Sequence, residues 1–402
     1  MSNLARRLRA IWWPIHRWIG IGLAVLLVPI AVSGALLVWR DHLDALIHPS
    51  RYAVTGAHLV EPSAYLASAA AALETRAQPV AVRFPLEEGW PVIVMARRAP
   101  RSEDGPARVV NIYLDPPTAR ALEVVDFRSS FVGWLHRFHE NLTIPEYSGR
   151  AVVGWVGVGM LTLALTGIWL WWPRNGAFLP GLRWRRAPQT TTNLHHLLGF
   201  WIAIPLAVVS FTGVYLSFPQ TARQLMSSIV AMTPQGPRPG FGAIASNARL
   251  TPDAALSAAL ASEPGARPAV IFLPTVSANA GGRGRVRGAE REGSSEGARD
   301  IGAVWRVQLR TVGNDEIATV VVDDRTGAVE RLPRALAGDR AAQWMRWIHE
   351  GSHSGPIWRF VVFLTGIFPV VFVVTGAIMW WRGRRGGATH RANSCGELQA
   401  AE

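Results

Sequence analysis

The 402-residue chain has no lysine and only one cysteine, Cys395. A single cysteine excludes an internal disulfide, a metal site built from several thiolates, and covalent haem attachment through a C-x-x-C-H motif. Every one of the 41 basic residues is therefore an arginine, and we interpret the missing lysine as a bias of genomic composition. Acidic residues are absent from the long apolar runs, which removes the buried carboxylates that a proton relay across a membrane favours.

Four apolar runs are long enough to cross a bilayer. Residues 18–39, 151–172 and 360–381 are each 22 residues without a charge, and a longer charge-free stretch contains a fourth helix. A membrane-spanning helix needs about 20 apolar residues, and tryptophans at the ends suit the lipid–water interface. The sequence therefore predicts an α-helical membrane protein with spans at 18–39, 151–172, 194–218 and 357–381. The first run is too long for the apolar core of a cleaved signal peptide.

Positive charge gathers in three short segments beside these helices. The segments 1–17, 173–193 and 382–402 hold twelve arginines against two acids, which accounts for +10 of the net charge of +13. Arginine-rich loops next to membrane helices stay in the cytoplasm. We therefore expect both termini and the 173–193 loop in the cytoplasm, and the segments 40–150 and 219–356 outside. This charge predicts membrane lipid, and no nucleic acid, as a partner.

The two outside segments share a pattern of predicted elements. In 40–150 we expect a helix and four strands, at 61–74, 80–84, 92–96, 109–114 and 122–125. In 219–356 we expect a helix and two strands, at 251–261, 269–273 and 320–322. Residues 278–299 are rich in Gly, Arg, Glu and Ser with almost nothing to bury, so this insert is predicted to be disordered. The tail after Arg385 is predicted to be unstructured.

The second half of the chain repeats the first. Landmarks of the second span recur 209 residues later in the fourth, and His139-Glu140 recurs 210 residues later as His349-Glu350. The first span matches the third without gaps at an offset of 179. We predict two tandem repeats, each composed of a helix, an outside α+β domain and a second helix. The matched pairs are Arg150/Arg359, Thr166/Thr375, Trp171/Trp380, His16/His195, Gly20/Gly199 and Gly34/Gly213.

Seven of the eleven histidines lie at the ends of predicted spans. Three lie at the cytoplasmic starts of the first and third spans: His16, His195 and His196. Four lie at the outer starts of the second and fourth spans: His136, His139, His349 and His353. If the repeats pack about a two-fold axis along the membrane normal, His16 faces His195 and His139 faces His349. The other four are interpreted as ordinary surface or interface residues: His42, His48, His58 and His390.

Histidines at both membrane faces are compatible with three kinds of site: a zinc or copper site, a proton relay and a bis-histidine haem. A zinc or copper site wants three or four converging ligands, which the outer end offers if Glu140 and Glu350 join its histidines. A proton relay is not favoured, because the predicted spans contain no carboxylate side chain. Bis-histidine haem needs two neutral imidazoles on facing helices and small residues for clearance, and both ends supply these. The same small residues also serve plain helix packing. They are Gly20, Gly34, Gly154, Gly157, Gly159, Gly167, Gly199 and Gly213.

Helix geometry and the repeat decide between neighbouring histidines. Adjacent side chains on a helix point about 100° apart, so His195 and His196 cannot both face one iron. The match to His16 favours His195. Residues three or four apart share a helix face, and there the repeat favours His139 and His349. The predicted haem ligands are His16 with His195 and His139 with His349; the secondary candidates are His136, His196 and His353. No catalytic residue can be named.

Short motifs surround these histidines at the matched positions. They are His16-Arg-Trp-Ile-Gly20 with Ser33-Gly34, Leu135–Leu142 with Thr166-Gly167, Leu194-His195 with Thr212-Gly213, and His349-Glu-Gly351 with Thr375-Gly376, together with the outside turns Asp115-Pro-Pro-Thr118 and Asp323-Asp-Arg-Thr-Gly327. In these motifs the chain resembles the PepSY-associated transmembrane family of iron-regulated inner-membrane proteins, which includes ferric-siderophore reductases. The resemblance covers nearly the whole chain, and Ala119 departs from it by replacing the usual glycine of the first turn.

The resemblance implies a bacterial inner-membrane protein with a PepSY-like periplasmic domain in each repeat. It also implies two non-covalent haem b groups and a ferric siderophore that is reduced in the periplasm. The chain has no flavin or nicotinamide domain, so the electron donor is expected to be quinol or a separate reductase. The residues alone leave an alternative open, a non-redox PepSY membrane protein that binds a peptide, a protease or a membrane subunit. A visible absorption spectrum distinguishes the two.

Overall fold

The computed structural model describes residues 3–74, 77–99, 108–172, 182, 187–233, 243–245, 247–276, 303–311, 317–332 and 335–399. The chain divides into two compact units. The helical unit is formed by Met1–Arg40, Trp134–Thr233 and Leu336–Glu402, and the sheet unit by Asp41–Gly133 and Pro234–Ala335. Each unit therefore draws on both halves of the chain. The predicted insert 278–299 lies outside the described residues.

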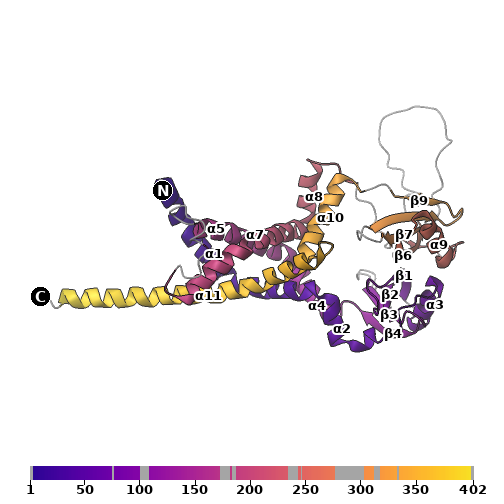
Figure 1. The fold of residues 1–402 in the computed structure, drawn as a ribbon, viewed down its shortest axis with the longest axis horizontal. Helices are drawn as coiled ribbons and strands as arrows, with labels where there is room; N and C mark the ends of the chain where they lie inside the picture. The colour runs from indigo at the N-terminus through magenta and orange to yellow at the C-terminus, as the bar shows by residue number, and fades with distance from the viewer. Residues whose placement is uncertain are drawn as a thin grey trace, which may run out of the picture. The chain divides into compact units, whose positions relative to one another are not determined.

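Among the described residues, four helices of the helical unit are long and apolar enough to cross a membrane, which is the number that the sequence predicted. They are α1 (Asn3–Val38), α5 (Gly149–Trp171), α7 (Thr190–Ser217) and α11 (Gly355–Gln399). Helix α1 packs on α5 and α11, and α7 packs on the same two helices. The four helices therefore form a bundle in which α1 and α7 are diagonal to each other (Figure 1).

Small and branched apolar residues pack the bundle. Leu27, Ile30 and Val156 form a buried cluster between α1 and α5. A Cβ atom added at Gly159 would collide with Leu23. This glycine therefore serves close helix packing, as is usual for small residues in membrane helices.

Short amphipathic helices lead into the second and fourth spans. Helix α4 (Phe131–Asn141) precedes α5, and α10 (Ala337–Glu350) precedes α11. Helix α10 ends at Gly351, whose φ of +71° places it in the left-handed region that favours glycine at a helix C-terminus. Two further short helices, α2 (Arg40–Ile47) and α8 (Pro219–Ser227), follow α1 and α7. None of these four helices was predicted, because charges interrupt their apolar pattern.

The strands of both outside segments join in one antiparallel sheet. The strands are β1 (Ala77–Arg83), β2 (Val92–Arg98), β3 (Arg108–Leu114), β4 (Ala121–Asp126), β5 (Ala243–Ile244), β6 (Arg267–Val276), β7 (Val304–Arg310), β8 (Ile317–Asp323) and β9 (Val329–Arg331). Their order is β4-β3-β2-β1-β6-β7-β8-β9, and β5 pairs with β6. The two halves meet where β1 pairs with β6, with Val82 opposite Ile271. The sequence predicted two outside domains and did not predict this shared sheet.

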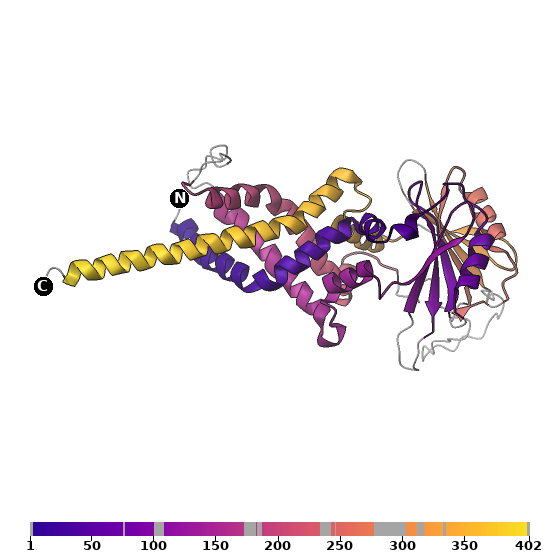
Figure 2. The same ribbon diagram turned by 90° about the horizontal axis from the view of Figure 1, so that it is seen from below.

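Two helices cover one face of the sheet. They are α3 (Pro62–Ala72) and α9 (Pro252–Ser262), and both lie on the same side of the strands (Figure 2). Their apolar side chains pack on the alternate strand residues that point toward them, including Ile112, Ile271 and Leu309, which are fully buried. Tyr65 of α3 is also fully buried, and its hydroxyl donates to the Pro116 carbonyl at 2.6 Å. This face is the core of the sheet unit.

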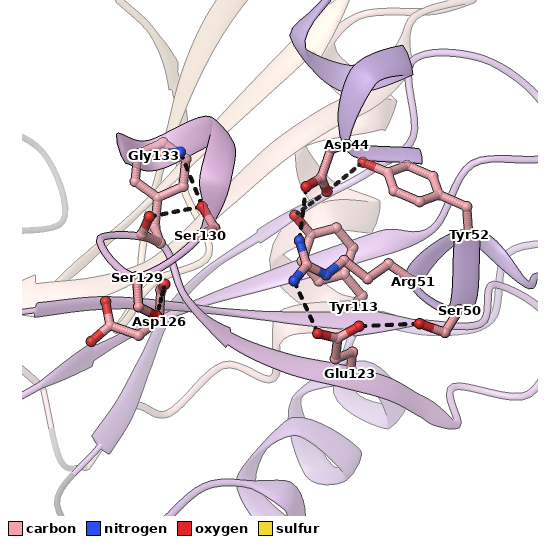
Figure 3. A network of polar contacts seen from close by, with 11 residues as sticks. Asp44, Ser50, Arg51, Tyr52, Tyr113, Glu123, Asp126, Ser129, Ser130 and Gly133 are labelled. Carbon is pink, nitrogen blue, oxygen red and sulfur yellow. Dashed lines mark hydrogen bonds and ion pairs between the residues drawn. The ribbon is translucent and has the colours of Figure 1, made fainter. Parts of the chain in front are cut away.

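On the opposite face, a polar network closes the first half of the sheet (Figure 3). Arg51, in the short 3-10 helix η1 (Pro49–Tyr52), donates to Asp44 of α2 at 2.8 Å and to Glu123 of β4 at 3.0 Å. The Tyr52 hydroxyl donates to the other oxygen of Asp44 at 3.0 Å. Burial, and then the nearby Asp44 carboxylate, raise the pKa of Tyr113 to about 12. The network fixes α2 and η1 over β3 and β4.

The first of the two Asp-Thr turns forms although it lacks the usual glycine. Thr118 donates to Asp115 at 2.5 Å. Burial raises the pKa of Asp115, but hydrogen bonds from Thr118 and Thr55 outweigh burial and hold this pKa below its ordinary value. Ala119 adopts a left-handed φ of +54°, close to the +72° of Gly327 in the second turn. The alanine therefore keeps the turn at the cost of backbone strain.

The prediction of an unstructured tail after Arg385 is wrong, because α11 continues to Gln399. No proline follows Pro369 in this helix, and the tail contains good helix formers such as alanine and arginine. The two glycines at 386 and 387 weaken the helix without ending it.

Candidate functional site

Four half-buried histidines lie in the helical unit. His16 lies on α1 and His195 on α7, whereas His139 lies on α4 and His349 on α10. These are the four residues that the sequence predicted as facing pairs. All four rings belong to one compact unit, so their mutual arrangement is defined.

The rings of His139 and His349 face each other. Their centroids are 6.2 Å apart and their planes are tilted by 39°. Nδ1 of His139 lies 2.9 Å from the carbonyl oxygen of Ile30, and Nδ1 of His349 lies 3.0 Å from that of Val209. A carbonyl oxygen can only accept, so Nδ1 of each ring donates and carries the proton. In a neutral ring, Nε2 then holds a free lone pair.

Burial keeps both of these rings neutral. It lowers the pKa of His139 to about 4, with a smaller contribution from the neighbouring His349. Burial also lowers the pKa of His349, against the opposing effect of its hydrogen bond to Val209. At neutral pH the two imidazoles are therefore in the form that binds a metal through Nε2.

A Ser-Gly or Thr-Gly dipeptide lies behind each of these two rings. Ser33 Oγ is 3.1 Å from Nδ1 of His139. A Cβ atom added at Gly34 would lie 2.7 Å from Cε1 of the same ring. Only glycine allows the helix backbone to approach the imidazole this closely. The matching dipeptide, Thr212-Gly213, holds His349 in the same way, with distances of 3.3 Å and 2.9 Å.

The second pair uses threonine hydroxyls. Nδ1 of His16 lies 2.8 Å from Oγ1 of Thr166 on α5, and Nδ1 of His195 lies 2.8 Å from Oγ1 of Thr375 on α11. The Thr166 hydroxyl donates its own proton to the carbonyl of Thr162 at 2.6 Å. Its oxygen is then left to accept from the ring, which places the imidazole proton on Nδ1 here as well.

The glycines beside this second pair leave more room. An added Cβ would lie 3.5 Å from Cε1 of His16 at Gly167, and 3.9 Å from Cε1 of His195 at Gly376. Both distances are ordinary van der Waals contacts. His16 lies on α1 and His195 on α7, the two helices that are diagonal to each other in the bundle.

In all four imidazoles, Nδ1 is thus engaged by a carbonyl or hydroxyl oxygen of a neighbouring helix. Among the described residues, no hydrogen bond is made by the Nε2 atom of any of them. From the sequence alone, the four Ser-Gly or Thr-Gly dipeptides were recognised as motifs. The only role predicted for their glycines was to leave room for a haem. The signal that could have found this role was their fourfold recurrence opposite a histidine.

The three secondary candidates are exposed and have other neighbours. Nδ1 of His136 lies 3.7 Å from Glu140, whose carboxylate also accepts from Arg150 at 2.9 Å. The ring of His353 stacks on Trp347, with centroids 4.2 Å apart. His196 is exposed next to His195. We therefore retain the four half-buried rings as the site.

The histidines that were interpreted as ordinary residues lie elsewhere. His42 packs edge-on against Trp90, with ring centroids 5.3 Å apart. His48 lines a cavity of about 420 Å³ together with Arg51 and Glu123. These residues belong to the sheet unit. Within the described residues, no three His, Cys, Asp or Glu side chains gather closely enough to hold a metal ion, so the zinc or copper alternative gains no support.

Two arginines that served only as repeat markers have a structural role. Arg359 donates to the Val38 carbonyl at the end of α1 and stacks on Trp39. Arg150 donates to the Leu216 carbonyl near the end of α7 at 2.9 Å. Each guanidinium therefore satisfies a carbonyl that the helix end leaves without a partner, and opposes the negative end of the helix dipole.

Comparison with known protein families identifies the family of this chain. It matches the PepSY-associated TM region family across residues 13–383. The match covers nearly the whole chain and contains all four spans and all seven candidate histidines, so the chain belongs to this family. Among curated proteins, none matches it.

Proposed function

We propose that this chain is a membrane electron-transfer protein that holds two haem b groups and reduces ferric siderophores. One observation carries the proposal: His139 and His349 face each other with ring centroids 6.2 Å apart and with Nδ1 of both rings engaged. At the other end of the bundle, Nδ1 of His16 and Nδ1 of His195 are also engaged, by Thr166 and Thr375.

The spacing of the first pair suits one iron between the rings. A metal–imidazole bond is about 2 Å long and the ring centre lies about 1 Å beyond the nitrogen, so two imidazoles that held one metal ion between them would have centres about 6 Å apart. Histidines that bind metals usually donate their other ring nitrogen to a carbonyl or carboxylate, which fixes the tautomer. Both requirements are met by His139 and His349.

The surrounding residues suit a non-covalent haem. The chain has no cysteine pair for thioether bonds. Glycines lie against all four rings, and the diagonal placement of α1 and α7 keeps their backbones apart. When bound, haem b supplies a one-electron carrier at each end. The chain's own contribution would be to fix the proton of each imidazole on Nδ1, which leaves the Nε2 lone pair to bind the metal.

The direction of transfer follows from the arginine distribution. Because the arginine-rich segments favour the cytoplasm, we place His16 and His195 at the cytoplasmic face of a bacterial inner membrane and both termini in the cytoplasm. His139, His349 and the sheet unit are then periplasmic. An electron donor, either quinol or a separate reductase, is oxidised on one side. Each electron released reduces one ferric ion in the periplasm to ferrous iron, which siderophore oxygens bind more weakly.

Reduction of a ferric chelate by the purified chain tests this proposal. In proteoliposomes loaded with reductant, the unaltered protein is expected to convert external ferric siderophore to ferrous iron, trapped by a ferrous-specific chromophore. His349→Ala should abolish this activity, and His353→Ala, a change at an exposed histidine nearby, should leave it intact. Full activity of the His349→Ala protein would overturn the proposed path.

The alternative is a non-redox membrane protein whose sheet unit binds a peptide, a protease or a membrane subunit. This function requires none of the four imidazole contacts described above. It predicts that protein expressed with ample haem has no Soret band, and the spectrum therefore decides between the two functions.

A further inference from the structure

The two halves of the sheet differ on the face opposite α3 and α9. In the first half, Ile93 and Tyr113 are opposite each other on β2 and β3, and both are buried beneath Tyr52. In the second half, Arg306 on β7 is opposite Val321 on β8. An arginine therefore occupies the register position that a buried isoleucine holds in the first half.

Arg306 points to the face opposite α3 and α9, because its neighbours along the strand point to the other face. Trp305 and Val307 are buried in the core beneath α9, and side chains alternate along a strand. Among the described helices, α9 is the one that packs on β7 and β8, and it does so on the core face. The described residues contain no counterpart of η1 that closes the second half.

The Arg306 guanidinium has no partner among the described residues. Its Nε atom is buried without a hydrogen bond, and no carboxylate forms an ion pair with the group. Burial lowers the pKa of Arg306, and no neighbouring charge opposes that effect. The nearest acid in the same cross-strand row is Glu330 on β9, beyond Val321. A half-buried cation that lacks a counter-ion is a favourable binding position for an anion.

A second unpaired arginine lies two strands away on the same face. Arg83 of β1 is opposite Val270 of β6, and Phe272 of β6 is opposite Arg306. Arg83 is exposed, and among the described residues it has no hydrogen bond or ion pair. The two guanidiniums thus flank the apolar surface of Val270 and Phe272. Two cations on either side of an apolar strip match a ligand with aromatic rings and several anionic oxygens.

We infer that the face of β1, β6 and β7 that lies opposite α3 and α9 binds an anionic, aromatic ferric chelate of the catecholate class. The inference rests on the proposed function for the identity of the metal, and the binding chemistry rests on Arg83, Arg306 and Phe272. A cationic or neutral hydroxamate chelate gains no charge complementarity at this face.

Gallium(III) chelates test the inference without any redox step, because gallium is not reduced under these conditions. Binding of trianionic gallium tris(catecholate) and of neutral gallium tris(acetohydroxamate) to the full chain in detergent is measured by calorimetry. The trianion is expected to bind, and to bind about tenfold more weakly after Arg306→Gln or Arg83→Gln. Arg325→Gln removes the same charge from the exposed β8–β9 turn and should leave the affinity unchanged.

Two of the variants separate loss of binding from loss of folding. Arg306→Lys preserves the charge and should retain most of the binding, which separates loss of a contact from loss of folding. Arg83→Gln changes an exposed residue that the fold does not need. Equal affinity for the two gallium chelates, or an equal loss with Arg325→Gln, would overturn the inference. Loss of ferric reduction with intact gallium binding would instead overturn the proposed function and leave the anion site standing.

Discussion

At the His139/His349 end, each Nδ1 meets a main-chain carbonyl, and each Cε1 meets a glycine that has no room for a methyl group. At the His16/His195 end, each Nδ1 meets a threonine hydroxyl, and the glycines have ordinary clearance. A carbonyl acceptor cannot be removed by substitution, whereas a hydroxyl can. The two ends should therefore respond differently to the same kinds of change.

Removal of a ring should have the largest effect. His139→Ala is expected to lose the haem at its own end and keep the haem at the other, because the two pairs share no residue. His16→Ala should give the converse result. Pyridine haemochrome assay of each variant should show half the haem of the unaltered protein. His136→Ala serves as the control, since this exposed ring contacts Glu140 and neither pair.

Loss of all haem in either single variant would contradict the expectation that the two ends bind haem independently. It would mean that the two ends fold or load together. The control then decides whether the loss is specific to the paired rings.

A methyl group on the glycines should separate the two ends. Gly34→Ala would bring a Cβ atom to 2.7 Å from Cε1 of His139, so the ring must shift. Overpacking of this kind costs about 1–3 kcal/mol, which corresponds to a loss of about 5- to 150-fold in haem affinity at that end. Gly167→Ala adds an ordinary contact at 3.5 Å and should be tolerated. Haem titration of the two haem-depleted variants measures the difference.

Equal losses in the two glycine variants would show that clearance at the imidazole is not what distinguishes the ends. The matched pair Gly213→Ala and Gly376→Ala repeats the test in the second half of the chain, with added-Cβ distances of 2.9 Å and 3.9 Å.

Loss of a threonine hydroxyl should have an effect of similar size, but at the opposite end of the bundle. Thr166→Val removes the hydroxyl that accepts from Nδ1 of His16, and it keeps the shape of the side chain. Loss of such an outer partner typically lowers metal affinity about 10- to 100-fold. Thr212→Val should change much less, because His349 keeps its bond to the Val209 carbonyl. Haem dissociation and reduction potential of both variants can be compared, and a larger change in Thr212→Val would contradict the assigned acceptors.

The sequence predicted the parts of this molecule that depend on local pattern. Charge-free runs of 22 residues or more identified the four apolar helices, since the bilayer fixes the length of a span. Alternation identified most strands, and β2 begins at Val92 as predicted. Strand β7 was missed, because its alternating arginine and glutamine residues lie next to the Gly-rich insert.

Long-range pairing could not be predicted in the same way. The junction of β1 with β6 joins residues that are about 190 positions apart, such as Val82 and Ile271. Nothing in either strand specifies that partner. The histidine pairs were predicted because the repeat relates them, but their Nδ1 partners were not. A carbonyl such as that of Ile30 has no sequence signature, and the role of Thr166 appears only once its helix is placed beside His16.

Haem stoichiometry tests the central claim most directly. The claim is that each facing pair of imidazoles holds one iron, so pyridine haemochrome assay of the purified chain, with protein quantified by amino-acid analysis, should give two b haems per polypeptide. A value of one would remove one end from the account. A value of zero after expression with ample haem would contradict it and leave the four engaged Nδ1 atoms without the metal that they are proposed to prepare for.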